Sequence, residues 1–138
     1  MRLSKSHRSY FKVARDVSEL SDYKTHNLGC VAVYCHKIIS SGYNSYKTNP
    51  TQKRLNACRF TENTPHTVHA EIACLLPLIR KRDVDFSRVQ LYIWRNHADG
   101  TPALARPCKS CMQLINELGI RHIYYTNEGG YSHEEILY

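Results

Sequence analysis

The fold class is decided by residues 69–126, where helix-like and strand-like patterns alternate. The segments HAEIACLLPLIR (69–80) and PCKSCMQLINEL (107–118) carry apolar residues at helical spacing. VQLYIW (89–94) and IRHIYYT (120–126) are short runs rich in β-branched and aromatic residues, which is typical of strands. A helix that connects two neighbouring strands of one sheet makes those strands parallel. This region therefore predicts an α/β fold.

The flanking segments add further elements to this unit. An amphipathic helix is predicted over residues 4–20, and the apolar runs 28–35 and 38–43 predict a hairpin. Weak alternation over residues 131–137 predicts an edge strand. We expect one domain over residues 1–138, a three-layer α/β/α arrangement with a mixed sheet of about five strands.

The overall composition excludes several classes of protein. Hydrophobic residues make up 42% and charged residues 22% of the chain, an ordinary globular mixture. The first ten residues lack the apolar stretch of a signal peptide, and the apolar run 72–79 is too short for a membrane span. We therefore expect a cytoplasmic protein that does not associate with membranes. The net charge of +7 favours anionic partners, either nucleotides or nucleic acid.

Six cysteines in a chain expected in a reducing compartment are better interpreted as metal ligands or buried thiols than as disulfides. Cys30, Cys35 and Cys74 lie in apolar runs and are predicted to be buried and inert. Cys58 and His66 lie in a polar stretch and are predicted to be ordinary loop residues, with a second, structural zinc as the alternative.

Two short motifs carry the chemistry, His69-Ala70-Glu71 and Pro107-Cys108-Lys109-Ser110-Cys111. Cys108 and Cys111 are three residues apart, so on a helix they project from the same side, and Pro107 suits a first helical turn. With His69 they supply three zinc ligands, the usual number at a catalytic site whose fourth position holds water. Zinc lowers the pKa of that water to about 7, and Glu71 is placed to act as general acid and base.

These residues resemble the cytidine and deoxycytidylate deaminase superfamily of zinc-dependent nucleobase deaminases, most closely its deoxycytidylate branch. The resemblance extends over residues 28–126 and includes Gly42-Tyr43-Asn44, which is similar to a family segment whose asparagine reaches the substrate. It implies one catalytic zinc held by His69, Cys108 and Cys111, proton transfer by Glu71, and substrate contacts from Asn44 and Ala70. The implied reaction is hydrolytic loss of ammonia from an aminated pyrimidine, in a protein that assembles as a homo-oligomer.

The residues leave three functions open. The first is deamination of a small cytosine nucleotide or nucleoside. The second is deamination within a polynucleotide, either of cytosine in single-stranded DNA or of adenosine in tRNA, which the net charge favours. The third is a non-catalytic module in which His69, Cys108 and Cys111 form a structural zinc site, with Cys74 or His66 as the fourth ligand.

Two polar stretches, residues 44–67 and 96–106, are predicted as loops that lead towards the two motifs. Residues 42–59, which lead towards His69, and residues 96–106, which lead into Pro107, are expected to form the walls of a substrate pocket. If the substrate is a nucleotide, its phosphate needs cationic partners, and arginine binds phosphate through two parallel hydrogen bonds. The candidates in these stretches are Lys47, Lys53, Arg54 and Arg106, of which Arg106 is favoured because Cys108 holds it near the metal.

Overall fold

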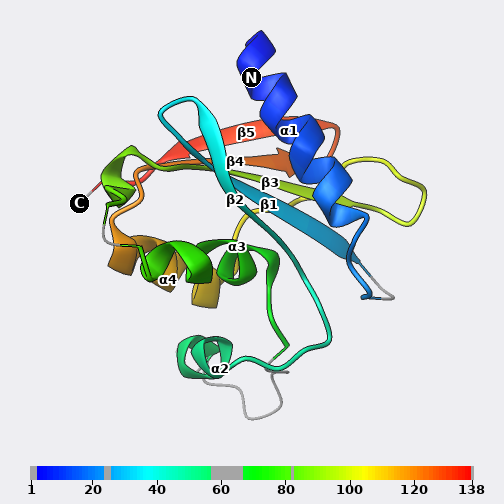
Figure 1. The fold of residues 1–138 in the computed structure, drawn as a ribbon. Coiled ribbons are helices and arrows are strands. Elements are labelled where there is room, and N and C mark those ends of the chain that lie inside the picture. Colours follow the sequence, from blue (N-terminus) through cyan, green and yellow to red (C-terminus); the bar gives the residue numbers. More distant parts are fainter. Residues whose placement is uncertain (1–2, 24–25, 57–66, 82, 138) are drawn as a thin grey trace.

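A mixed five-stranded sheet with the strand order β2-β1-β3-β4-β5 forms the centre of the protein (Figure 1). The computed structural model describes residues 3–23, 26–56, 67–81 and 83–137. The strands are β1 (Asn27–Tyr34), β2 (Lys37–Tyr43), β3 (Gln90–Asn96), β4 (His122–Asn127) and β5 (Gly130–Glu135). The predicted α/β class with a mixed sheet of five strands is therefore confirmed.

The predicted parallel unit is present, and a strand has been inserted beside it. Strands β3 and β4 are parallel neighbours joined through α4 (Lys109–Leu118). Strands β2 and β3, joined through α3 (Ala70–Ile79), are not neighbours, because β1 lies between them and pairs antiparallel with both. Only the second crossover therefore produces adjacent parallel strands, whereas both had been expected to do so.

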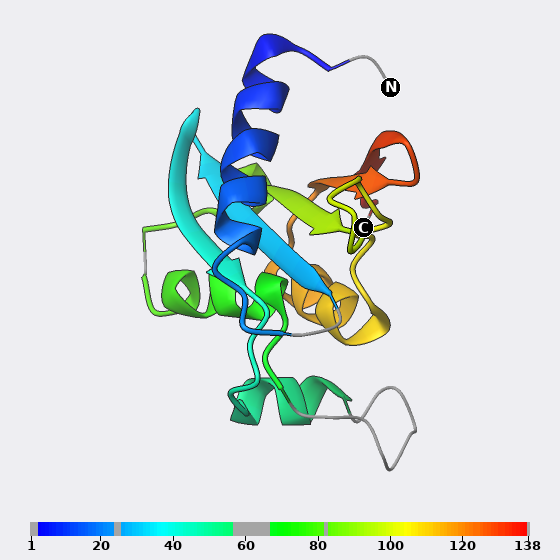
Figure 2. The same ribbon diagram turned by 90° about the vertical axis from the view of Figure 1, so that its right-hand side faces the viewer.

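Helices cover both faces of the sheet, which gives the predicted three layers. Helix α1 (Lys5–Ser18) packs on one face, and α3 and α4 pack on the other (Figures 1 and 2). Strand residues alternate between two cores, as the two-residue period of a strand requires. Val31, Tyr92 and Tyr124 face α1, whereas Ala32 and Ile93 belong to the larger core beneath α3 and α4.

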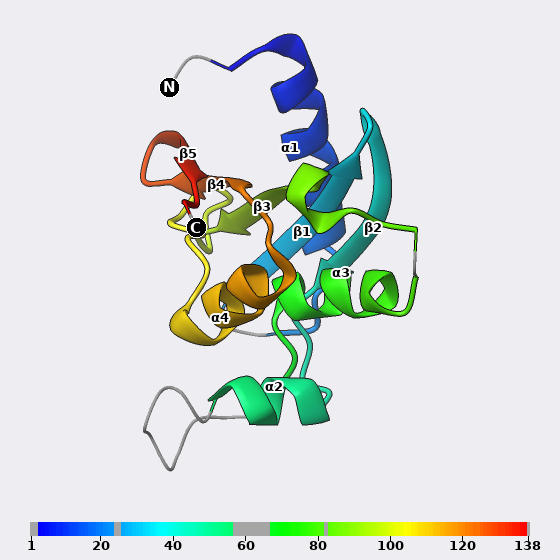
Figure 3. The same ribbon diagram turned by 90° about the vertical axis from the view of Figure 1, so that its left-hand side faces the viewer.

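A short helix, α2 (Pro50–Asn56), lies inside the stretch predicted to be a loop (Figure 3). The Asn49 side chain accepts hydrogen bonds from the backbone N–H groups of Thr51 and Gln52, so it caps the helix start. Leu55 is buried. Seven residues with one large apolar side chain give too weak a periodic signal for a sequence to reveal.

The β1–β2 hairpin turns one residue earlier than expected. Cys35 and His36 both have positive φ, 51° and 64°, as a two-residue turn between twisted strands requires. The turn therefore lies at Cys35-His36 and not at His36-Lys37. Cys35 is consequently exposed, and the prediction that it is buried is wrong; Cys30 and Cys74 are buried as predicted.

Cys58 and His66 lie outside the described residues.

In the described part of the chain, the helices are all too short or too polar to cross a membrane.

Candidate active site

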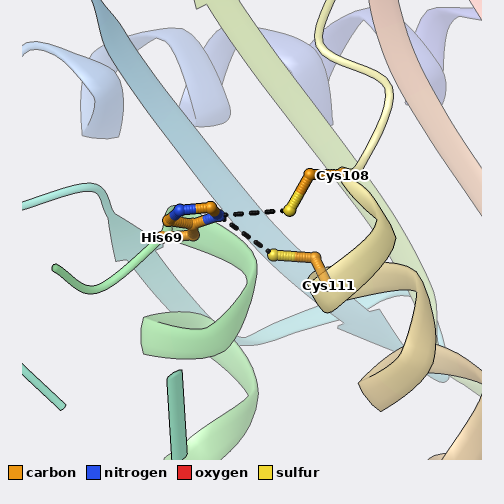
Figure 4. A group of neighbouring side chains, drawn as sticks. All are labelled: His69, Cys108 and Cys111. Atoms are coloured by element: carbon orange, nitrogen blue, oxygen red, sulfur yellow. Dashed lines mark hydrogen bonds between the residues drawn. The ribbon is translucent and has the colours of Figure 1, made fainter. Parts of the chain in front are cut away.

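Three side chains predicted to bind metal meet where α3 and α4 begin (Figure 4). His69 immediately precedes α3, Cys108 immediately precedes α4, and Cys111 lies in the first turn of α4. Their candidate ligand atoms all lie within 4.8 Å of one another. Helix α4 begins at Lys109, two residues later than predicted, so Pro107 is outside the helix and Cys108 occupies the N-cap position.

The distances within this cluster fit a zinc ion. His69 Nδ1 lies 3.4 Å from Cys108 Sγ and 3.4 Å from Cys111 Sγ. Zinc bonds of about 2.0 Å to nitrogen and about 2.3 Å to sulfur, at tetrahedral angles, separate such ligands by roughly 3.6 Å. The donor set of one imidazole and two thiols is also one that zinc prefers. Geometry and chemistry therefore both match a three-ligand zinc site.

The two thiols of the cluster have opposite tendencies to ionise. The hydrogen bond from the Cys111 thiol, followed by interactions with His69, lowers the pKa of Cys108 to about 3, although burial opposes this shift. The same hydrogen bond and burial raise the pKa of Cys111. The lowered pKa of Cys108 favours its thiolate form, which is the protonation state that a metal ligand needs.

Glu71 lies in the first turn of α3, beside the cluster, and is only 3% exposed. Its Oε1 is buried without a hydrogen-bond partner among the described residues. Burial is the largest influence and raises the pKa of the carboxyl group, although the nearby His69 counteracts it. A carboxyl group in such a position exchanges a proton closer to neutral pH than an exposed glutamate does, as a general acid–base group requires.

A buried polar network, absent from the sequence-based predictions, holds the two helix starts together. Gln52 on α2 accepts a hydrogen bond from the His69 backbone N–H at 3.1 Å, and its amide donates to Asn56 at 2.8 Å. Asn56 also accepts a hydrogen bond from the Ser110 hydroxyl on α4 at 2.9 Å. All three polar side chains are almost completely buried. Helix α2 therefore fixes the position of His69 relative to α4.

A cavity of about 280 Å³ opens beside the cluster. Six residues predicted to form the site line it: Asn44, His69, Ala70, Glu71, Arg106 and Cys108. Leu104 and Ala105 also line it and belong to the predicted wall 96–106, whereas six further lining residues were not predicted: Tyr23, His26, Leu28, Thr67, Val68 and Arg95. The other basic candidates, Lys47, Lys53 and Arg54, do not line it.

The Asn44 side chain is buried and ties together three parts of the chain. Its Oδ1 accepts hydrogen bonds from the Leu28 N–H at 2.9 Å and from the Ser21 hydroxyl at 2.6 Å. Its Nδ2 donates to the His26 carbonyl at 3.0 Å. These hydrogen bonds, two to the backbone and one to a side chain, hold Asn44 in place in the wall of the cavity.

Arg106 also lines the cavity and already has an acidic partner. Its Nε donates to Glu134 on β5 at 2.9 Å, and the hydrogen bond raises the pKa of the guanidinium group further. Both side chains remain substantially exposed. An ion pair in such a setting contributes little stability, so Glu134 can be exchanged for another anion at small cost.

Of the two fourth ligands proposed for a structural zinc site, Cys74 does not belong to the cluster, and His66 lies outside the described residues. Within the described ranges, the group of candidate metal ligands comprises His69, Cys108 and Cys111 alone. Cys74 instead lies beside Cys30, whose pKa is raised by burial first and then by this neighbouring thiol. Among the described residues, the cluster thus supplies three candidate ligands and no fourth.

Comparison with known proteins assigns the chain to a family. Residues 4–127 match the family described as the cytidine and deoxycytidylate deaminase zinc-binding region. The chain belongs to this family. Solved structures of deaminases share the fold of this chain. Among curated proteins, none matches the sequence of the chain significantly.

Two solved structures illustrate the shared deaminase fold. The dCMP deaminase of cyanophage S-TIM5 in its apo form is 23% identical, with a TM-score of 0.65 over 93% of this chain and 87% of that one. The cytidine deaminase of Burkholderia pseudomallei is 15% identical, with a TM-score of 0.65 over 94% and 91% of the two chains. At these identities the likeness concerns the fold and does not define the substrate.

Proposed function

We propose that the protein is a zinc-dependent hydrolytic deaminase of a cytosine nucleotide or nucleoside, which releases the uracil product and ammonia. The observation that carries this proposal is that a cluster of three candidate metal ligands lies beside a cavity lined by the buried Glu71, whose Oε1 has no hydrogen-bond partner among the described residues. A purely structural zinc site has four protein ligands and does not need the carboxyl group.

His69, Cys108 and Cys111 would hold the zinc ion. When bound, zinc lowers the pKa of a coordinated water molecule to about 7, which makes it a nucleophile at neutral pH. The pKa of Cys108, about 3, means that this ligand does not need to lose a proton when the metal binds.

Glu71 would move the protons of the reaction. Hydrolysis replaces the exocyclic amine of the base with an oxygen atom from water and releases ammonia. The Glu71 carboxylate accepts a proton from the attacking water and returns it to the substrate as the C–N bond breaks. Its burial suits both steps, since a raised pKa lets it hold a proton between them.

Three further residues of the cavity wall are proposed to contact the substrate: Asn44, Ala70 and Arg106. Ala70 is the first residue of α3 and lies between the ligand His69 and Glu71. Arg106 offers a cation to a substrate phosphate. Asn44 would act from a position that is already fixed by its bonds to Leu28 and His26.

The proposal is tested by incubating the zinc-loaded protein with dCMP, deoxycytidine, CMP and cytidine and measuring ammonia release. Glu71→Gln keeps the size of the side chain but removes its acid–base function. We expect turnover to fall by about 10²- to 10⁴-fold with zinc content unchanged. Absence of turnover of all four compounds, in protein that contains one zinc per chain, would refute the proposal.

A second candidate, a deaminase of single-stranded polynucleotides, is favoured by an aromatic pair at the cavity. Tyr23 lines the cavity and stacks on Tyr46 with ring centroids 4.3 Å apart, and Tyr46 is 44% exposed. Exposed aromatic rings stack on the bases of single strands. Binding that weakens steeply and linearly with salt on a log–log plot, together with turnover of an oligonucleotide only, would favour this candidate.

A further inference from the structure

The net positive charge of the protein is concentrated at its first helix. Residues 1–15 contain five of the 19 basic residues and none of the 12 acidic ones, so they carry five of the seven net positive charges. The remaining residues, 16–138, have 14 basic side chains against 12 acidic ones. Most of the chain is therefore close to neutral, and the charge that attracts anions belongs to α1 and the residues before it.

Four of these basic side chains form a stripe along α1: Lys5, Arg8, Lys12 and Arg15. They are spaced by three, four and three residues, which places them within an arc of about 80° around the helix axis. All four are exposed, whereas Phe11 and Ala14, on the side of the helix towards the sheet, are buried. The basic stripe therefore faces solvent over a length of about 15 Å. Asp16 and Glu19 mark its end.

The basic stripe does not stabilise the helix that carries it. Like charges three or four residues apart are neighbours on a helix surface and destabilise the helix. The first turn of α1 begins with Lys5 and contains no acidic residue, although the positive end of the helix dipole favours negative side chains there. In the described ranges of the chain, the ion pairs join Arg54 to Glu117, His97 to Glu128 and Arg106 to Glu134, and none involves α1. Repeated positive charge that weakens its own helix points to an anionic partner outside the chain.

The length and surroundings of the basic stripe fit a nucleic acid better than a membrane. Phosphates follow one another every 3.4 Å or so along each strand of a duplex, so about 15 Å of helix lies beside about four phosphates. A helix that lies in a membrane surface needs an exposed apolar side. The large exposed apolar side chains of the described residues all lie outside α1, and Ser6 and Ser9 occupy the exposed surface beside the stripe.

We propose that Lys5, Arg8, Lys12 and Arg15 bind the phosphate backbone of a nucleic acid, on a docking surface that is separate from the active site. Helix α1 packs on one face of the sheet, whereas α3 and α4, where the metal ligands lie, pack on the other (Figure 2). None of the four stripe residues lines the cavity. The strand on this surface anchors the protein and is not its substrate, so the inference does not depend on the proposed function.

Binding of an oligothymidylate tests the proposal without turnover, because thymine has no exocyclic amine to lose. Fluorescence anisotropy of a labelled strand of about 12 nucleotides measures its affinity for the zinc-loaded protein at several salt concentrations. Because the stripe neutralises about four phosphates, the log–log plot of the association constant against salt is expected to have a slope of about −3. The double variant Arg8→Gln, Lys12→Gln is expected to halve this slope and to weaken binding at least about tenfold at low salt.

Two further double variants separate the basic stripe from general effects of charge. Arg80→Gln, Lys81→Gln removes the same charge from the exposed end of α3, where cations suit the helix dipole, and is expected to bind like the wild type. Arg8→Lys, Lys12→Arg keeps the charge of the stripe and is expected to keep the slope. The glutamine variant of α1 removes repulsion between like charges, so we expect its Tm to equal or exceed that of the wild type.

Absence of binding at low salt, or an affinity that does not change with salt, would overturn the proposal, and neither outcome requires a variant to fold. Equal weakening by the double variants of α1 and of the α3 end would overturn it too, because net charge and not the stripe would then decide binding. Unchanged binding by Arg8→Gln, Lys12→Gln would refute the assignment to α1. Binding to vesicles of phosphatidylserine and phosphatidylcholine, but not to the oligonucleotide, would overturn it in favour of a membrane surface. All of these outcomes leave the proposed deamination, which the ammonia assay tests separately, unaffected.

Discussion

Gly42 on β2 allows the helix that carries Glu71 to lie directly against the sheet. A Cβ atom at Gly42 would lie 2.3 Å from the Cys74 backbone nitrogen and 2.7 Å from the Ala70 carbonyl oxygen. Ordinary van der Waals contact begins at about 3.4 Å, so Gly42→Ala requires α3 and β2 to separate by about 1 Å. The contacts are backbone atoms, which cannot rotate away.

Such overpacking costs typically 1–3 kcal/mol, and we expect about 3 kcal/mol here because rotamer changes bring no relief. For a chain of this length that corresponds to a fall of about 10 °C in Tm. The separation also moves the start of α3, where His69 and Glu71 lie. Zinc ligation tolerates errors of about 0.2 Å, so a shift of about 1 Å is expected to weaken zinc binding strongly.

Gly29 provides a matched control on the other face of the sheet. A Cβ atom there would lie 2.1 Å from the Ala14 carbonyl oxygen and 2.5 Å from the Ser18 nitrogen, both on α1. Gly29→Ala is therefore expected to lower Tm by a similar amount and to leave zinc affinity close to that of the wild type. Thermal melts with zinc and with chelator, combined with a zinc competition titration, distinguish the two variants.

A Tm for Gly42→Ala within about 2 °C of the wild type would refute the argument from close packing. Equal weakening of zinc binding in both variants would refute the argument that β2 positions the metal ligands through α3.

Three further predictions concern stability and metal. Asn44→Ala removes three hydrogen bonds to the surrounding chain, and urea denaturation should show a loss of about 2–3 kcal/mol. The pKa of His133 is lowered below 6.5, mainly by burial and then by His122, with His7 acting in the same direction and Glu135 against it. The unfolded chain therefore takes up that proton first, so stability falls as pH drops below about 6.5, and Tm should vary less with pH in His133→Gln than in the wild type. Identical Tm profiles between pH 5 and 7 would contradict this. Chelation of zinc should lower Tm and abolish ammonia release, and added zinc should restore both.

The cluster of candidate metal ligands and the neighbouring Glu71 could be predicted because their signal is local. His69, Glu71, Cys108 and Cys111 are recognisable by residue type and by short spacing along the chain, which also places the ligands at helix starts. The large core could be predicted for a similar reason, since long apolar patterns such as residues 89–94 and 107–118 specify strands and helices on their own. One detail differed: the helix begins two residues later than predicted, so Cys108 is its N-cap, because sequence patterns locate a helix end only to within one or two residues.

The remaining features depend on contacts between residues far apart in sequence, and so only the tertiary structure decided them. The insertion of β1 between β2 and β3 is a matter of strand pairing, for which no residue of β1 carries a signal. Helix α2 is too short to be stable alone, and it exists here through the buried contacts of Gln52 and Asn56 with the starts of α3 and α4. Arg95 appeared in sequence as an ordinary residue after an apolar strand. Strand pairing brings it to the cavity wall, where its Nε is buried without a hydrogen-bond partner.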